Sequence, residues 1–319
     1  MAEHCNVVQV HLGKAVPSYL YDQLRQTRVL NPGNSMYLIL GPGTEHDTAH
    51  LKTLEVVVVD VASVVKCQNH RRFIRGNRLN PRSLGGFWRY TTERFFAIES
   101  FLEACRLRNV VHMENDVMLY AGLDSLLPGF HAACPGAGII MDSERRCVPG
   151  LMYLSALPAL SAMNDFIVRN ALRKRQTDMQ AIGAFMGQAT FAECSALPVL
   201  PPRYRELFPL VNAKAEEGSS PWYDAAFGQF GGVFDGAALG QFVGGIDKIH
   251  DPGDTTGFVN ETAVYDPRKM GIHWKTENGL RRPFGMVDGS EFPIFNLHIH
   301  SKQLERFSSS ASAPTAAPA

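Results

Sequence analysis

The chain has 319 residues, enough for one large domain or two smaller ones, and its hydrophobic content of 45% is that of a globular protein with a sizeable core. Lysine and arginine together number 31, as do aspartate and glutamate, so the formal net charge is zero. This balance argues against a dedicated nucleic-acid-binding protein, because such proteins usually carry a basic excess.

The six cysteines form no CxxC pair, and their spacing suits neither a zinc site nor a compact disulfide framework. We therefore expect reduced thiols, with Cys105 in the core. The N-terminal sequence MAEHCNVVQV lacks a basic region followed by a long apolar run, and no stretch approaches the ~18 consecutive apolar residues of a membrane span. These features predict a cytoplasmic protein without a signal peptide or a transmembrane segment.

Short apolar runs alternate with helical segments in the first half of the chain. Strands are predicted at Asn6–His11, Met36–Leu40 and Val56–Val61, with a helix at Val16–Leu30 between the first two. The β-branched runs indicate strands that are buried on both faces, as in a parallel sheet. Strands that alternate with helices predict an α/β fold.

The clearest helical pattern covers Thr91–Leu107, where large apolar residues and Cys105 fall on one face. Thr91 or Thr92 would cap the start of this helix. A strand at Asn109–Met113 follows almost at once. Because ligands of open α/β sheets bind at the carboxyl ends of the strands, the residues directly after this strand lie where a site is expected.

The second half is less regular. A strand is predicted at Gly138–Met141, a helix at Ser161–Lys174 and a final strand at Phe295–His300. Between the helix and the final strand, a region rich in Gly, Pro and aromatic residues runs from Leu197 to about Gly257. Such a loop-rich region is typical of the part of an enzyme that shapes an acceptor pocket.

Two acids, Glu114 and Asp116, follow the strand with Asn115 between them, and the chain becomes apolar again at Val117. Two carboxylates at the end of a strand can converge on Mg²⁺ or Mn²⁺, which prefer oxygen ligands and keep positions open for substrate phosphates. Such an ion would stabilise a diphosphate leaving group as a Lewis acid. The alternative is that the two acids only begin a polar turn, but the apolar sequence on both sides favours a site.

This order of helix, apolar strand and acid-x-acid turn resembles the DxD region of GT-A-fold glycosyltransferases, with Glu114-Asn115-Asp116 as the triplet. The resemblance implies a Rossmann-like, mostly parallel central sheet flanked by helices, followed by a loop-rich acceptor-side half. It also implies transfer of a sugar from a UDP- or GDP-sugar to a glycan, glycoconjugate or other hydroxyl acceptor, with Mn²⁺ or Mg²⁺ as cofactor. Asp116 would be the principal metal ligand, and Glu114 would act through the metal, a water or the ribose.

The same resemblance implies a single catalytic domain at 1–307. Its nucleotide-sugar-binding half would cover about 6–125, and its acceptor-side half about 126–307. Residues 308–319 are of low complexity and are expected to form a disordered tail.

The sequence LHIHSK near the C-terminus carries a second part of the resemblance. Several metal-dependent members of this fold return a C-terminal histidine to the metal and place a nearby lysine on the diphosphate. Lys302 resembles that lysine. His298 and His300 face the same way on a strand, so the sequence does not distinguish which of them is the metal ligand. The alternative for at least one of them is an ordinary core or surface histidine.

Three further residues resemble functional positions of the family. Arg94, in the helix before the acidic strand, would reach the nucleotide sugar or orient a catalytic carboxylate, with Arg89 as its competitor. Asp235 would be a catalytic carboxylate, the general base if the enzyme inverts. Asp178 is the second catalytic candidate and would bind sugar hydroxyls. Asp235 is an equally natural cap for the predicted helix Gly236–Phe242, and for Asp178 a helix cap is slightly favoured over the sugar-hydroxyl role.

The ends of two other strands carry weaker candidates for nucleotide binding. His11-Leu12-Gly13, just after the first strand, resembles the place where this fold receives the nucleotide base. Asp60 ends the third strand and would bind the base or the ribose, or only cap a turn.

Other functions also fit these residues. A nucleotide-sugar pyrophosphatase or a nucleotidyltransferase would use the same acids on a diphosphate, and a non-catalytic sugar-binding module would bind glycans without a metal. A zinc hydrolase built on His273, His298 and His300 is a more distant alternative. The sequence leaves open the donor sugar, the base, the acceptor, the linkage, the anomeric outcome and the oligomeric state.

Overall fold

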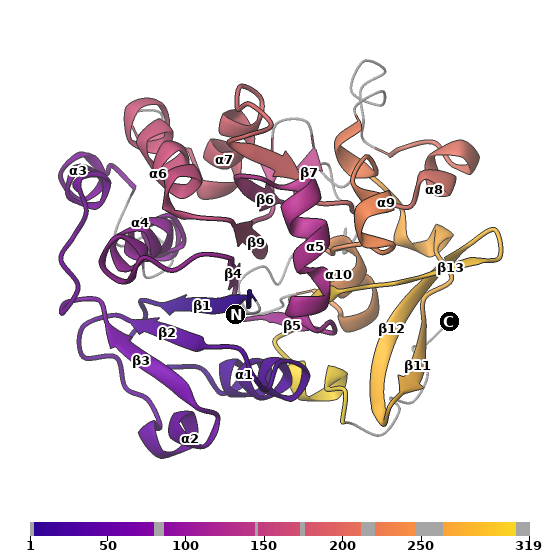
Figure 1. Cartoon of the computed structure of the whole chain (residues 1–319), viewed down its shortest axis with the longest axis horizontal. Coiled ribbons are helices and arrows are strands. Elements are labelled where there is room, and N and C mark those ends of the chain that lie inside the picture. Colours follow the sequence, from indigo (N-terminus) through magenta and orange to yellow (C-terminus); the bar gives the residue numbers. More distant parts are fainter. Residues whose placement is uncertain are drawn as a thin grey trace.

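The computed structural model describes residues 3–79, 86–143, 146–172, 176–211, 221–246 and 264–310. These residues form a mixed α/β fold around a seven-stranded sheet with the order β10-β6-β9-β4-β1-β2-β3 (Figure 1). The strands of this sheet are β1 Asn6–His11, β2 Met36–Leu40, β3 Val56–Asp60, β4 Val110–Met113, β6 Ala137–Ile139, β9 Leu151–Leu154 and β10 Cys194–Ala196.

The sheet is mostly parallel. Strands β4, β1, β2 and β3 all run in one direction, and β10 runs parallel to β6, whereas β9 is antiparallel to both of its neighbours. Carboxyl ends of parallel neighbours meet at one edge, so the ends of β1 and β4 lie side by side in the middle of the sheet. The predicted α/β class with a mostly parallel, helix-flanked sheet is confirmed.

Helices cover the sheet on both sides. Figure 1 shows α3, α4, α6 and α7 on one side and α1 and α2 on the other. The helices are α1 Ser18–Leu30, α2 Thr48–Thr53, α3 Gln68–Gly76, α4 Phe87–Cys105, α5 Leu123–Ala133, α6 Leu157–Phe166, α7 Asp178–Met186, α8 Pro202–Leu207, α9 Phe227–Phe230 and α10 Ala238–Gly244. One π-helical and three 3₁₀ segments add to these in the described residues, at Ile167–Ala171, Pro221–Tyr223, Pro267–Lys269 and Leu304–Phe307.

The C-terminal part of the chain returns to the middle of the molecule. Strands β11 His273–Glu277, β12 Leu280–Val287 and β13 Ser290–Pro293 form an antiparallel sheet of their own. The next strand, β14 Asn296–His298, instead pairs antiparallel with β5 Val117–Leu119, and His298 lies opposite Val117. A short antiparallel pair, β7 Met141–Ser143 with β8 Arg146–Cys147, completes the strands. The β5–β14 ladder therefore brings the C-terminal histidines to the residues that follow β4.

In helix α4, the helical pattern predicted the buried apolar residues correctly, but not the start of the helix or the position of Cys105. Phe95, Ile98 and Leu102 are buried as predicted. The helix begins at Phe87, after the N-cap Gly86, whose φ is +89°, so the predicted threonine cap is wrong. Thr92 lies inside the helix, and its hydroxyl donates to the carbonyl of Trp88. Cys105 is exposed rather than in the core, because the helix ends there.

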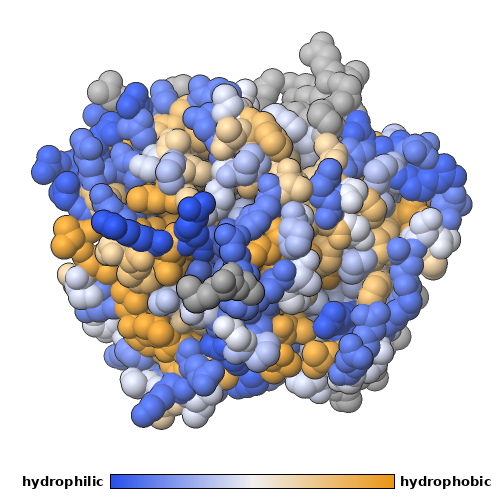
Figure 2. All heavy atoms as spheres, in the orientation of Figure 1, coloured by the Kyte–Doolittle hydropathy of each residue, from blue (hydrophilic) through white to orange (hydrophobic). Residues whose placement is uncertain are grey.

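The prediction of strands buried on both faces holds for β1 and β2 and is wrong for β3. Strand β3 is the last strand of the sheet, and the side chain of Val57 is 52% exposed. Figure 2 shows hydrophobic residues at the surface at the lower left, where β2, β3 and α2 lie. An apolar run of this kind does not reveal by itself that a strand lies at the edge of a sheet.

The segment after the last 3₁₀ turn is packed at its start. Ser309 is buried, its N–H donates to the side-chain oxygen of Gln26, and its hydroxyl accepts from the amide of Gln26 at 2.6 Å. The predicted disordered tail therefore does not begin at 308, and its remainder, 311–319, lies outside the described residues. Within the described part of the chain, no helix combines the length and the apolar character that a membrane crossing requires.

The β5–β14 ladder makes a first prediction. Leu297 is fully buried in β14, so Leu297→Ala removes core contacts and should lower the free energy of unfolding by about 2–5 kcal/mol. Urea denaturation followed by circular dichroism measures this change. Met286→Ala in β12, whose side chain is 42% exposed, is the matched control and should cost much less. Equal losses in the two variants would contradict the role given to the ladder.

Candidate active site

The acidic triplet forms the turn between β4 and β5. The N–H of Glu114 donates to the carbonyl of Gly150 at 2.8 Å, and the N–H of Val117 donates back to the carbonyl of Glu114 at 3.2 Å. Strand β4 is buried along its whole length, so this turn projects from the core of the sheet at its carboxyl edge. Asp116 is buried and Glu114 is partly exposed.

His298 reaches the triplet through the β5–β14 ladder. Its Nε2 lies 3.3 Å from a carboxylate oxygen of Glu114 and 3.2 Å from one of Asp116. Among the described residues, Glu114, Asp116 and His298 are the His, Cys, Asp and Glu side chains that could hold one metal ion together, with ligand atoms within 4.8 Å of one another. Two carboxylate oxygens and one imidazole nitrogen are suitable ligands for a divalent cation such as Mn²⁺.

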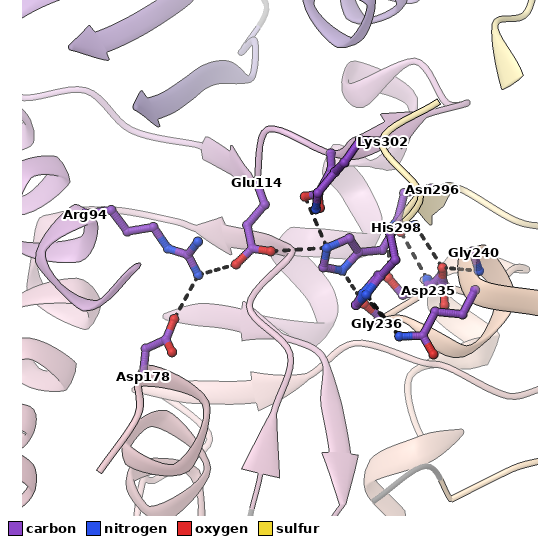
Figure 3. A network of polar contacts seen from close by, with 12 residues as sticks. Arg94, Glu114, Asp178, Asp235, Gly236, Gly240, Asn296, His298 and Lys302 are labelled. Atoms are coloured by element: carbon purple, nitrogen blue, oxygen red, sulfur yellow. Dashed lines mark hydrogen bonds and ion pairs between the residues drawn. The ribbon is translucent and has the colours of Figure 1, made fainter. Parts of the chain in front are cut away.

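The imidazole of His298 is held in a defined orientation. Its Nδ1 lies 2.7 Å from the carbonyl oxygen of Gly236, and a carbonyl only accepts, so Nδ1 carries a proton. Nε2 is therefore the nitrogen that faces the carboxylates, as Figure 3 shows for Glu114. The backbone N–H of Ile299 donates to the carbonyl of Asp116 at 2.8 Å. This bond joins the residue after His298 to the backbone of the acidic turn.

His300 does not belong to this group. Its ring nitrogens lie 3.1 and 3.4 Å from the side-chain nitrogen of Gln241, and its ring is 4.4 Å from the ring of His298. Burial and the charge of His298 lower the pKa of His300 to about 3, so it stays neutral. The geometry thus favours His298 as the metal ligand, while the metal-binding role predicted for His300 stays a prediction.

Three positive side chains compensate the two acids. Burial acts to raise the pKa of the Asp116 carboxyl, but the ion pair with Lys302 and the contact with His298 outweigh it and hold that pKa well below its usual range. Partial burial also acts to raise the pKa of the Glu114 carboxyl, but Arg94 together with His298 outweighs it and lowers that pKa. Both carboxylates are therefore ionised near neutral pH and are available to a cation.

Arg94 links the triplet to α7. Its guanidinium forms ion pairs with Glu114 and, at 3.1 Å, with Asp178 (Figure 3). Asp178 is the first residue of α7, whereas Thr177 caps that helix, so the interpretation of Asp178 as the cap is wrong. Burial raises the pKa of the Asp178 carboxyl despite Arg94. Arg89, the alternative to Arg94, pairs instead with Glu93 at 3.2 Å.

His11 lies beside the middle residue of the triplet. The amide nitrogen of Asn115 is 3.0 Å from Nδ1 of His11, and Nε2 of His11 donates to the carbonyl of Ala15 at 2.7 Å. The pKa of His11 is lowered by burial, which favours a neutral ring that accepts from Asn115. Gly13 allows this geometry, because a Cβ there would lie 2.8 Å from the His11 ring. Leu12 lies between them and packs against the core.

Asp60 is not brought to the triplet. It ends β3, which β2 and β1 separate from β4. Its carboxylate accepts from the N–H of Ala62 at 2.8 Å and is exposed, so it caps the following turn. The nucleotide-binding roles given to His11, Leu12, Gly13 and Asp60 stay predictions, and the placement is favourable for His11 and unfavourable for Asp60.

Asp235 faces the interior of the protein. It is fully buried, and its carboxylate oxygens accept from the backbone N–H groups of Leu239, Gly240 and His298. These contacts argue against the predicted role as a general base, since such a base must reach an acceptor hydroxyl. The catalytic role of Asp235 stays a prediction that the geometry does not favour.

The sequence did not single out the residues that hold His298. These are Gly150, Gly236, Gly240 and Asn296. A Cβ on Gly150 would lie 3.0 Å from Nδ1 of His298, and a Cβ on Gly240 would lie 2.0 Å from its carbonyl oxygen. The clustered glycines around Asp235 were the available signal, because glycine allows close approach of backbone segments.

No family model and no curated protein matches this chain. Solved structures do match it, and the three described below have TM-scores from 0.37 to 0.42. The PaToxG glycosyltransferase is 12% identical with a TM-score of 0.39, and the match covers 56% of this chain and 65% of that one, slightly less than two thirds of its length. Apo mouse xyloside xylosyltransferase 1 is 12% identical with a TM-score of 0.42, and the match covers 64% of this chain and 90% of that one.

A third match is the galactosyltransferase LgtC, solved with donor and acceptor sugar analogues. It is 10% identical with a TM-score of 0.37, and the match covers 63% of this chain and 78% of that one. The structural neighbours are GT-A-type glycosyltransferases, the family that the acidic triplet resembles. Every one of these TM-scores is below 0.5, so these matches carry no information on the function of this chain.

The ionised cluster makes a prediction about pH in the metal-free protein. Burial opposes the charging of His298, but Asp116 and Glu114 outweigh it and raise the pKa to about 9. The stabilisation from this charge is fully present below the unfolded pKa near 6.5 and is lost as the pH rises through about 9. It should be on the order of 3 kcal/mol. His298→Gln should therefore lose stability at pH 7.5 relative to the parent and lose much less at pH 9.5.

Urea denaturation in the presence of a chelator measures this difference at several pH values. His300→Gln is the matched control, because the native His300 is already neutral and its contribution should be constant from pH 7.5 to 9.5. A His298→Gln difference that does not change with pH would show that His298 is not charged by the acids.

Proposed function

We propose that this chain is a metal-dependent glycosyltransferase that acts on a nucleoside-diphosphate sugar, a UDP- or GDP-sugar, with a glycan or glycoconjugate hydroxyl as acceptor. The observation that carries the proposal is the convergence of Glu114, Asp116 and His298 at the carboxyl edge of β4. Ligand binding at that edge is the rule for open α/β sheets.

The residues fit a divalent cation. The carboxylates of Glu114 and Asp116 and the imidazole of His298 would hold the cation and would leave positions for water and phosphate oxygens. The imidazole favours Mn²⁺ over Mg²⁺, since Mg²⁺ takes mainly oxygen ligands. When bound, the cation supplies Lewis-acid stabilisation of the diphosphate that leaves the sugar.

Lys302 lies on the same side of the triplet as His298. Its ammonium group pairs with the Asp116 oxygen that His298 does not contact. A cation on Asp116 would weaken this pair and allow the ammonium to bind a diphosphate oxygen. Lysine acts well as a point charge on phosphate groups. Lys302 would therefore stabilise the charge that develops on the leaving group.

Arg94 and Asp178 lie on the opposite side. Arg94 is buried and fixes Glu114 through an ion pair, which limits the number of orientations available to that carboxylate. Asp178 is held by the same guanidinium at the start of α7. A carboxylate held in this way accepts hydrogen bonds from sugar hydroxyls in a defined direction, so Asp178 would orient the donor sugar.

A thermal-shift screen of UDP-, GDP-, ADP- and CMP-sugars with and without Mn²⁺ tests the proposal. A ligand that binds only the native state raises the melting temperature by mass action. One nucleotide family should raise it in a Mn²⁺-dependent way, and Asp116→Asn should abolish that shift. Asp288→Asn, which changes an exposed carboxylate in the turn after β12, is the matched control and should leave the shift intact.

The bound donor is then tested for turnover. Release of the nucleoside diphosphate that depends on an added acceptor supports transfer. Release of a sugar phosphate without an acceptor would instead indicate a pyrophosphatase, and metal-independent glycan binding without turnover would indicate a sugar-binding module. No shift from any nucleotide with any metal would overturn the proposal.

A further inference from the structure

Asp235 is a fully buried carboxylate beside the site that accepts three backbone hydrogen bonds. It follows the short bridge between Val233 and Ile294 and precedes α10. One oxygen accepts from the N–H of Leu239 at 3.0 Å, and the other accepts from the N–H groups of Gly240 and His298 at 2.8 and 2.9 Å. The carboxylate thus joins the first turn of α10 to the backbone of β14.

A second set of bonds fixes the backbone of Asp235 itself. The side-chain amide of Asn296 donates to the carbonyl of Asp235 at 2.8 Å and accepts from its N–H at 3.2 Å. Asn296 is fully buried and lies two residues before His298 in β14. The side chain of Asp235 therefore cannot move relative to β14 without breaking these bonds as well.

The residue next to Asp235 controls the imidazole ring. The carbonyl of Gly236 accepts from Nδ1 of His298 at 2.7 Å, which leaves Nε2 to face Glu114 and Asp116. Asp235 thus holds the backbone of His298, and its neighbour Gly236 holds the ring. Figure 3 shows Asp235 and Gly236 beside His298, on the side away from Glu114.

Gly240 brings the two segments into backbone contact. A Cβ at this position would lie 2.0 Å from the carbonyl oxygen of His298 and 2.8 Å from its nitrogen. These distances are far below normal contact, and the clashing atoms belong to backbone that cannot rotate away. Gly244, on the same helix, would bring its Cβ only to 3.4 Å from the nearest side-chain atoms.

We propose that Asp235 is a positioning residue of the metal centre. It ties the start of α10 to the backbone of His298 and thereby directs Nε2 of His298 at the carboxylate pair. The proposal rests on the proposed function only in taking a divalent cation as the ligand of Glu114, Asp116 and His298. It gives Asp235 no contact with the sugar, the acceptor or the reacting atoms.

Asp235→Asn tests this role with little change in size. An amide has only one acceptor oxygen, so at least one of the three backbone N–H groups would face its NH₂ group instead. Loss of a group that orients a metal ligand typically lowers metal affinity about 10–100-fold. We expect a decrease of this size in Mn²⁺ affinity, measured by electron paramagnetic resonance of free Mn²⁺ in a titration of the whole protein without nucleotide.

Asp124→Asn is the control for loss of a carboxylate that accepts from backbone. Asp124 accepts from the N–H of Cys5 and from the amide of Asn34, beside the start of β1 and so at the other end of the sheet. This variant should lose stability and keep the parental Mn²⁺ affinity. If Asp235→Asn also keeps the parental affinity, the positioning role of Asp235 is wrong while the proposed function stands.

A second pair of variants is used if Asp235→Asn does not fold. Gly240→Ala should decrease Mn²⁺ affinity by displacing His298, whereas Gly244→Ala should not, although both place the same residue in α10. Equal Mn²⁺ affinities in these two variants would also overturn the proposal. If the parent protein binds no Mn²⁺, the proposed function fails at its metal, and the role of Asp235 in a metal centre fails with it.

Nitrogen NMR of the His298 ring separates positioning from general stability. The parent should show a proton on Nδ1 that is protected from exchange by the carbonyl of Gly236. Asp235→Asn should lose this protection, and Asp124→Asn should retain it. A protected Nδ1 proton in Asp235→Asn would show that the ring is held without the carboxylate.

Discussion

The register of the β5–β14 ladder is the constraint on which the site depends. His298 lies opposite Val117, so the imidazole meets the carboxylates of the preceding turn. Side chains alternate between the two faces of a strand, and a shift of one residue would place His298 on the wrong face and Leu297 in its position. The register is fixed because Leu297 and Met118 are both fully buried. Burial of apolar residues in the ladder therefore sets the geometry of a polar centre.

The second requirement is charge compensation. Two carboxylates close to each other repel, and burial acts to raise the pKa of each. Arg94 from α4, His298 from β14 and Lys302 from the segment after β14 supply opposite charge, each from a different part of the fold. A bound cation would replace part of this charge. The same contacts therefore stabilise the protein without a metal and keep both acids ionised, as the proposed metal centre requires.

The sequence was most informative where the constraint is local. A buried parallel strand must end at the sheet edge, so the position of Glu114 and Asp116 followed from the apolar run before them. The choice between His298 and His300 depends on a register set by residues far away in the chain, and no local pattern contains it. The contacts of Asp235 could not be predicted either. An aspartate before a helix has the same sequence pattern whether it caps the helix, takes part in catalysis or binds a neighbouring strand. The prediction that β3 is buried on both faces was wrong, because an apolar run does not indicate whether one or both faces of a strand are covered.

The glycine-rich segment around Asp235 explains how backbone groups hold His298, the proposed metal ligand. Gly236 offers its carbonyl to the ring, and Gly240 lets α10 approach the backbone of His298. A side chain at Gly240 would clash with the backbone of His298, separate the two segments and leave the orientation of the imidazole unfixed. Fixing the ring before the metal arrives removes an entropic cost from binding. The ring is ordered during folding instead, when the buried Asp235 carboxylate accepts hydrogen bonds from all three N–H groups. The proposed metal centre therefore depends on the packing of α10 on β14.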